Sequence, residues 1–172
     1  MGKFKILKQE ADMKRFLIIV ISLLIILPSC GSRQLVETKF INEKAKLRFI
    51  IAGDSSEFKD SIREEIIEKY RNSCNIEIVN IEKLGNILRE NFDFILIMQT
   101  IKGWGMLNPE MKDFINKIKD KDRIVLFATS MNPYYNYSYE GIDAVTTASQ
   151  MEKKDEILKK LSEKIDRLIS GK

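Results

Sequence analysis

The chain has 172 residues and a net charge of +4, from 29 Lys and Arg against 25 Asp and Glu. The residues before Cys30 account for +3 of this charge, so the rest of the chain is nearly neutral. This balance gives no basis for a basic surface that binds nucleic acid. The chain has no histidine, which excludes histidine-dependent catalytic triads and imidazole metal sites.

Residues 1–29 have the profile of a secretory signal peptide. Basic residues precede an uncharged, mostly apolar block, residues 16–27, which is shorter than the roughly 20 residues that span a bilayer. The run Leu27-Pro28-Ser29-Cys30 resembles a bacterial lipoprotein cleavage box, in which Pro28 replaces a residue that is usually small. The resemblance implies cleavage before Cys30, acylation of Cys30 with fatty-acid chains such as palmitate, and a membrane-anchored domain outside the cytoplasm. The alternative is an uncleaved, short membrane anchor.

Two further expectations follow from this segment. Met13-Lys14-Arg15 is itself an ordinary start for such a signal peptide, so translation is expected to begin at Met13. If Cys30 is acylated, Cys74 has no partner for an internal disulfide. Cys74 is therefore expected to be a small packed residue, with a reactive thiol as the alternative.

The first half of the remaining chain predicts a tether, two strands and a helix. Residues 30–45 are polar with scattered apolar residues and are expected to be a tether. Residues 46–53 form a mostly apolar strand, and residues 76–81 form a shorter, more alternating strand nearer an edge. Asp54 and Glu57 form a pair typical of a capping box at the start of a helix. The buried stripe of that helix is Phe58, Ile62, Ile66, Ile67 and Tyr70.

The middle of the chain predicts a βαβ unit, preceded by a weak, short helix over residues 83–89. Residues 92–98 are continuously apolar except for one acid, which indicates a central strand covered on both faces. Asn108 and Pro109 are typical of a helix start. Residues 123–129 supply the second strand. The helix between the strands has the apolar stripe Met111, Phe114, Ile115 and Ile118.

The last part of the chain predicts an aromatic loop, a strand and a long helix. Residues 130–141 have no helical period and contain four tyrosines, so they are expected to be a loop. Residues 142–146 predict a short strand, and Ser149 with Glu152 predicts a capping box. The stripe of the final helix is Ile157, Leu158, Leu161, Ile165, Leu168 and Ile169.

This order of elements predicts the fold class. Five strands alternating with helices over residues 46–170 indicate an α/β protein with a doubly wound, five-stranded parallel sheet in a three-layer sandwich. In such a fold, ligands bind at the carboxyl ends of the strands.

Three stretches of the chain resemble the flavodoxin family. Residues 100–115 resemble its loop after the third strand, through Trp104-Gly105, Pro109 and the Lys-x-Phe that follows. Residues 122–130 resemble its fourth strand, and residues 141–149 resemble its carboxyl-terminal region. The resemblance implies electron transfer by FMN, with the phosphate in the turn after the first strand and the flavin ring between the loops after the third and fourth strands.

The resemblance also implies a set of contact residues. Ser55 and Ser56 would donate hydrogen bonds to the phosphate, and Trp104 would stack on the flavin. Tyr134 or Tyr137 would cover the other face of the ring. The full set of expected cofactor-binding residues is Ser55, Ser56, Thr100, Trp104, Gly105, Ser130, Tyr134 and Tyr137. No catalytic residue and no metal ligand is expected.

The phosphate turn departs from the family pattern. The turn from Gly53 to Glu57 lacks a central glycine and carries two carboxylates, Asp54 and Glu57. At about 5 Å and an effective dielectric of about 20, each carboxylate repels a unit of phosphate charge by about 3 kcal/mol. The alternative interpretation is that Asp54 and Glu57 only cap the helix.

Two functional hypotheses remain open. One is a lipid-anchored flavodoxin-like protein that binds FMN and transfers electrons. The alternative is a cofactor-free flavodoxin-like module for extracytoplasmic protein interaction through Trp104 and the tyrosine loop, since Trp and Tyr dominate interface hot spots. Trp104 could also simply pack over the end of the central strand.

Overall fold

The computed structural model describes residues 35–132, 134 and 136–171, apart from the side chain of Trp104. The predictions for residues 1–29 and Cys30 lie outside the described residues. The strands in this part of the chain are β1 Thr38–Phe40, β2 Leu47–Gly53, β3 Cys74–Asn80, β4 Phe94–Thr100, β5 Ile124–Thr129, β6 Ser138–Tyr139, β7 Ile142–Asp143 and β8 Val145–Thr147.

Three α-helices and several 3-10 helices connect these strands. The α-helices are α2 Glu57–Tyr70, α3 Pro109–Lys117 and α4 Lys154–Ser170. The 3-10 helices are η1 Ile81–Asn86, η2 Arg89–Asn91, η3 Gly103–Gly105, η4 Lys121–Arg123 and η5 Met151–Lys153. The three apolar stripes identified in the sequence correspond to these three α-helices, as predicted.

The main sheet has six strands in the order β1-β3-β2-β4-β5-β8. The five strands from β3 to β8 in this order are parallel to their neighbours. Strand β1 pairs antiparallel with β3. The predicted parallel five-stranded core is confirmed, and the additional strand makes the complete sheet mixed.

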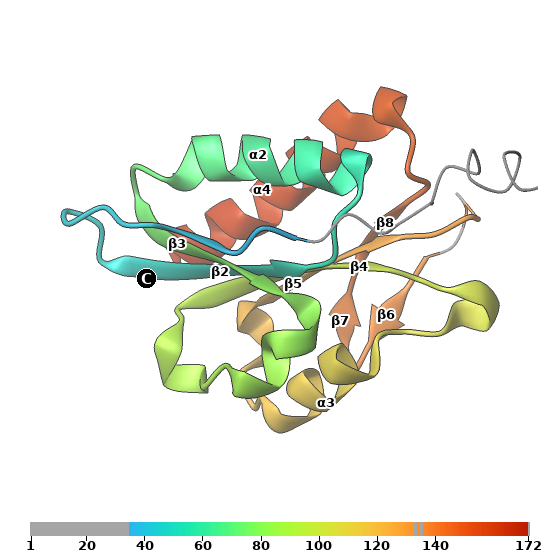
Figure 1. The fold of residues 1–172 in the computed structure, drawn as a ribbon, viewed down its shortest axis with the longest axis horizontal. Helices are drawn as coiled ribbons and strands as arrows, with labels where there is room; N and C mark the ends of the chain where they lie inside the picture. Colours follow the sequence, from blue (N-terminus) through green and yellow to red (C-terminus); the bar gives the residue numbers. More distant parts are fainter. Residues whose placement is uncertain (1–34, 133, 135, 172) are drawn as a thin grey trace, which may run out of the picture. The chain divides into compact units, whose positions relative to one another are not determined.

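Helices cover both faces of the sheet, as Figure 1 shows: α2 and α4 lie on one face and α3 lies on the other. One buried apolar cluster joins α2 and α4 to the sheet, and a second joins η1 and α3 to the opposite face. The alternate side chains of β2 are divided between the clusters, with Phe49 and Ile51 in the first and Ile50 and Ala52 in the second. This is the predicted three-layer sandwich.

Strand β4 is the centre of the sheet, as its apolar sequence predicts. Its first six residues are buried, and it pairs with β2 on one side and β5 on the other. A strand covered on both faces has no solvent-exposed face, which explains why its sequence is continuously apolar. Cys74 at the start of β3 is fully buried in the first cluster, in agreement with the predicted packed residue.

Strand β1 is the largest addition to the predicted fold. It lies inside the range 30–45 that was expected to be a tether, so the sheet begins earlier in the chain than the sequence indicated. Three residue pairs link it to β3, from Thr38 opposite Ile78 to Phe40 opposite Ile76. A three-residue strand with two exposed positions has too short a pattern to be recognised from sequence.

Two local predictions were wrong. The short helix predicted over residues 83–89 is instead 3-10 helix η1 followed by η2. Its buried residues Ile81 and Leu84 are three apart, which suits the tighter 3-10 repeat. The tyrosine loop contains strand β6, which forms a hairpin with β7. Glu140 and Gly141 both have positive φ, the backbone that a two-residue hairpin turn requires.

The starts of the last two helices differ in how well the sequence predicted them. The Asn108 side chain accepts a hydrogen bond from the Met111 backbone N–H at 3.1 Å, and Pro109 begins α3, as predicted. The capping box of Ser149 and Glu152 is absent, because η5 precedes α4 and the α-helix begins three to four residues later than expected. Asp155 and Glu156 are the acidic residues in the first turn of α4.

Candidate functional site

The order of the strands creates a switch point between β2 and β4. The chain leaves β2 for α2 on one face of the sheet and leaves β4 for α3 on the other face (Figure 1). A crevice of about 690 Å³ lies there, and Asp54, Ser55, Gln99 and Thr100 are among its lining residues. When the five parallel strands are numbered by their order in the chain, their order across the sheet is 2-1-3-4-5.

The fold is flavodoxin-like. In this fold the crevice at the switch point, beyond the carboxyl ends of the strands, is where a ligand is expected. The volume of the crevice falls within the range of about 300–1,000 Å³ that small-molecule sites occupy. Of the residues predicted to bind a cofactor, it brings together Ser55 from the turn after β2 and Thr100 from the end of β4.

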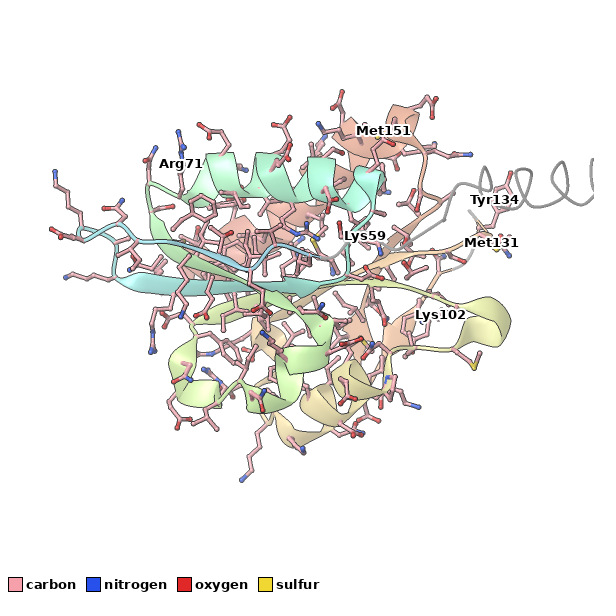
Figure 2. All side chains as sticks on the ribbon, viewed as in Figure 1. Lys59, Arg71, Lys102, Met131, Tyr134 and Met151 are labelled. Atoms are coloured by element: carbon pink, nitrogen blue, oxygen red, sulfur yellow. The ribbon has the colours of Figure 1, made fainter. Side chains whose placement is uncertain are left out.

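A buried lysine forms the centre of the turn after β2. Lys59, in the first turns of α2, is 1% exposed and lies between α2 and the sheet (Figure 2). Its Nζ donates to the Asp54 carboxylate and, at 2.5 Å, to Thr100 Oγ1. Thr100 Oγ1 in turn donates to the other oxygen of Asp54 at 3.1 Å. Burial lowers the pKa of Lys59, and the adjacent Asp54 carboxylate offsets part of that effect.

A second buried cation extends this network. Arg63, one helical turn after Lys59, is 6% exposed. Its guanidinium donates to the Asp60 carboxylate at 2.6 Å and to the Asp54 backbone carbonyl at 2.7 Å. The Ser55 hydroxyl donates to the other oxygen of Asp60 at 2.7 Å. The turn after β2 is thus held by charges and hydroxyl groups of its own chain.

The expected role of Asp54 as a helix cap is wrong. Ser56 is the N-cap of α2, and its hydroxyl accepts a hydrogen bond from the Lys59 backbone N–H at 3.3 Å. Asp54 instead turns its carboxylate toward Lys59 and Thr100. Glu57 is exposed at the first helical position. The sequence pattern was ambiguous because Asp54 and Ser56 are both good capping residues, two positions apart.

These contacts test whether the turn could hold the phosphate of FMN. A phosphate site needs donors that point outward at a helix start. Here the Ser55 hydroxyl donates to Asp60, and the Ser56 hydroxyl accepts from the helix backbone. The two nearby cations are buried and paired with Asp54 and Asp60. Apart from the Ser56 O–H, the side-chain donors of this turn are bound to its own carboxylates, so the side chains fit a phosphate dianion poorly.

The loops after β4 and β5 form a second, smaller cavity of about 210 Å³. Gly105 and Ser130, both expected to contact the cofactor, line it together with Lys102 and Met131. The Ser130 hydroxyl already accepts a hydrogen bond from the Asn132 backbone N–H at 3.1 Å. Lys102 also lines the main crevice, so the two cavities adjoin at this residue.

The two predicted tyrosines lie in different environments. Tyr134 is 91% exposed and lies at the end of the molecule beside Met131 (Figure 2). Tyr137 packs against the apolar cluster on the α3 side of the sheet. Tyr137 is therefore part of the packing beneath the small hairpin. The backbone of Trp104 belongs to η3 in the loop after β4, and its side chain is outside the described part of the chain.

Sequence reasoning missed Gln99 and the buried cations. Gln99 is 1% exposed and lines the crevice; its Oε1 accepts a hydrogen bond from the Asn108 backbone N–H at 3.2 Å. Its Nε2 is buried without a hydrogen-bond partner among the described residues. A signal for the cations was present, because Lys59 and Arg63 are four residues apart and adjoin the apolar stripe at Phe58 and Ile62.

The sequence matches no protein-family model and no curated protein. Oxidised flavodoxin 2 from Bacillus cereus is 15% identical, with 70% of this chain and 98% of that chain covered at a TM-score of 0.47. Oxidised flavodoxin 1 from the same organism is 16% identical, with 69% and 97% covered at a TM-score of 0.45. The strand order itself defines the fold.

None of the helices in the described ranges has the length and apolar content needed to cross a membrane.

Proposed function

We propose that this protein is a lipoprotein anchored through Cys30 whose flavodoxin-like domain works without FMN, as a binding module outside the cytoplasm. The observation that carries this proposal is the paired, buried network of Lys59, Asp54 and Thr100. It fills the turn in which a flavodoxin-like protein would hold a phosphate. The anchor is supported by the sequence Leu27-Pro28-Ser29-Cys30 and by the apolar block that precedes it.

The electrostatics of the turn disfavour a phosphate in two ways. The Asp54 side chain is 38% exposed, so its carboxylate is the charge that an entering ligand meets. Lys59 and Arg63 are already bound to Asp54 and Asp60, so they could donate to a phosphate only if those hydrogen bonds broke. Removing one partner of a buried ion pair typically costs about 3–5 kcal/mol. FMN would have to supply that free energy before its phosphate gained a single new contact.

The crevice itself remains suitable for another ligand or for a segment of a partner protein. Its lining combines the amide of Gln99, the hydroxyl of Thr100 and the side chains of Met106 and Leu107. Most of the other lining residues are polar or charged, and placed polar groups of this kind give a recognition site its specificity. The Gln99 Nε2 has no hydrogen-bond partner among the described residues, and it would meet a carbonyl or carboxylate oxygen of a ligand only if the buried amide turned toward the crevice.

A second candidate function is the FMN-binding electron carrier. The observation in its favour is the position of the crevice at the switch point, together with a volume large enough for a ligand of that class. On this alternative, Thr100 and Gly105 would contact the flavin, Trp104 would stack on it, and Tyr134 would cover it. FMN would supply one-electron and two-electron redox chemistry.

A flavin titration distinguishes the two candidates. The full-length chain is purified in mild detergent, mixed with a large excess of FMN and passed through a gel-filtration column. We expect no flavin absorbance to elute with the protein and no saturable quenching of Trp104, the one tryptophan of the sequence. Co-eluting flavin, with saturable quenching of Trp104, would contradict the proposal and favour the FMN-binding candidate instead.

A further inference from the structure

The edge of the sheet that holds the crevice carries a set of exposed apolar side chains, which we call the apolar rim. Met131 is 97% exposed, Tyr134 91%, Val36 77% and Met106 59%. Met106 follows β4, and Met131 and Tyr134 follow β5. Val36 precedes β1. Lys102, Met131 and Tyr134 lie at one end of the molecule in Figure 2, and Arg71 lies at the other end.

The described chain also begins at this edge. Leu35 lines the crevice together with Asp54, Lys102 and Met106. Two residues later, Glu37 accepts a hydrogen bond from the Asn80 backbone N–H, at the carboxyl end of β3, at 3.1 Å. Strand β1 then runs antiparallel to β3, away from this edge. The chain therefore enters the domain at the carboxyl ends of the parallel strands.

The distance from the entry point to the proposed anchor is short. Leu35 is five positions after Cys30, and a fully extended chain covers at most about 3.3–3.6 Å per position, or about 17 Å in total. The seven-residue strands β2 and β4 are themselves about 20 Å long. An acylated Cys30 could not reach a bilayer that lay against the opposite, amino-terminal edge of the sheet.

We propose that the apolar rim contacts the lipid surface of the membrane that holds Cys30. This inference rests on the acylation of Cys30 in the proposed function. Large exposed apolar side chains indicate a contact surface, and a tyrosine combines an apolar ring with a hydroxyl that suits the boundary between lipid and water. The exposed Lys102 beside the rim is attracted to anionic lipid headgroups. In this orientation the edge that holds the crevice faces the membrane surface.

The test measures how deeply individual positions lie in lipid. Full-length Met131→Cys and Tyr134→Cys proteins are labelled with an environment-sensitive fluorophore and reconstituted into phosphatidylethanolamine and phosphatidylglycerol vesicles with nitroxide-bearing lipids. The native Cys74 is fully buried, and the unsubstituted protein measures any labelling there. We expect a blue-shifted emission at both positions and quenching by nitroxides near the headgroups.

Ile41 supplies the matched control. It is apolar and 79% exposed, and it follows β1 at the amino-terminal edge. The label in Ile41→Cys is expected to keep its aqueous emission and to resist lipid quenching. Equal quenching at Ile41 and Met131 would overturn the proposed orientation. A blue shift at the rim that grows with protein density, without lipid quenching, would also overturn it, because a second copy would then cover the rim.

The mass of the intact protein separates failure of this inference from failure of the proposed anchor. Acyl chains on Cys30, absent from Cys30→Ser, together with a water-exposed rim would contradict the orientation alone. A protein without acyl chains would contradict the anchor, and the orientation would fail with it.

Discussion

The turn after β2 and the loops after β4 and β5 lie at the same edge of the sheet, yet the usual relation between polarity and burial is reversed in both. Near the turn, the charged residues Lys59 and Arg63 are 1% and 6% exposed. In the loops, the apolar residues Met131 and Tyr134 are 97% and 91% exposed. Buried charges are tolerated when they are paired, and exposed apolar groups indicate an outside contact. In one region the buried charges are paired within the chain, and in the other the exposed apolar side chains form the surface for which we propose a membrane contact.

Breaking the charge network should give the largest effect on stability. Asp54→Asn leaves the ammonium of Lys59 buried beside Thr100 and without its counter-ion. We expect the free energy of unfolding to fall by about 3 kcal/mol, the lower end of the range for a broken buried pair. Urea denaturation followed by circular dichroism measures the change. A loss below about 0.5 kcal/mol, typical of an exposed substitution, would show that the pair contributes little.

A double-mutant cycle provides the control for that experiment. Lys59→Met keeps most of the side-chain volume and removes the charge. The double variant Asp54→Asn with Lys59→Met is expected to lose at least about 1 kcal/mol less than the two single variants together, because each charge is costly only without the other. Strict additivity would mean that the two side chains do not interact as described.

The close approach of β2 and β4 beneath the turn should give the next largest effect. A Cβ added at Gly53 would lie 2.7 Å from the backbone oxygen of Met98, which cannot move without disturbing the central strand. Gly53→Ala is expected to cost about 2 kcal/mol, as overpacking in a core does. Gly103→Ala in the loop after β4 is the matched variant, since no atom of the described residues beyond its chain neighbours lies within 4 Å of its added Cβ. Equal stabilities of the two variants in urea would contradict this account.

A partly exposed hydrogen-bond pair away from this edge gives a smaller effect that depends on pH. The Tyr70 hydroxyl donates to Asp166 at 2.7 Å, and Lys69 lies 3.0 Å from the same carboxylate. Burial alone would raise the pKa of Asp166, but the hydrogen bonds from Tyr70 and Lys69 outweigh it and lower the pKa below 3.8. This carboxylate therefore stabilises the fold above about pH 4, and the contribution is lost as the pH falls through the folded-state pKa.

Tyr70→Phe tests that linkage. The substitution removes the hydroxyl and is expected to cost about 1 kcal/mol near neutral pH. Because protonated Asp166 gains little from the hydroxyl, the difference from the unsubstituted protein should narrow as the pH falls from about 5 to about 3. Urea denaturation at several pH values measures this. A difference that stays constant over that range would contradict the assigned role of Asp166.

The rim should give the smallest effect on stability. Met131 is almost fully exposed, so Met131→Ser is expected to change the free energy of unfolding by less than about 0.5 kcal/mol. The same substitution should reduce contact with anionic vesicles, measured by lipid quenching of a label at Tyr134→Cys. A marked loss of stability would mean that Met131 belongs to the fold, against its observed exposure.

The sequence predicted the core of the fold because the longest patterns are also the most buried. The apolar run that became β4 and the stripes of α2, α3 and α4 each describe one continuous buried surface. It did not predict β1, whose three residues gain their strand conformation from pairing with β3. The hairpin turn at Glu140 and Gly141 lacks the Asn-Gly or Asp-Gly that usually marks such a turn.

The candidate site was predicted in position but not in chemistry. Ser55 and Thr100 do line the crevice at the switch point, because strand order alone determines where that edge lies. The direction of the Asp54 carboxylate depends on Lys59, which lies five positions later in the first turn of α2. A motif of adjacent residues does not reveal this contact. Gln99 was missed because it lies inside a strand that otherwise reads as apolar core.

The most direct test of the central claim is the NMR signal of the Lys59 side-chain ammonium in ¹⁵N-labelled full-length protein, recorded in detergent micelles with and without excess FMN. Its loss in Lys59→Met assigns the signal. We predict a slowly exchanging signal that FMN leaves unchanged, because Nζ is held by Asp54 and Thr100. A signal that shifts in a saturable way as flavin binds would contradict the claim that the chain's own charges fill the phosphate turn.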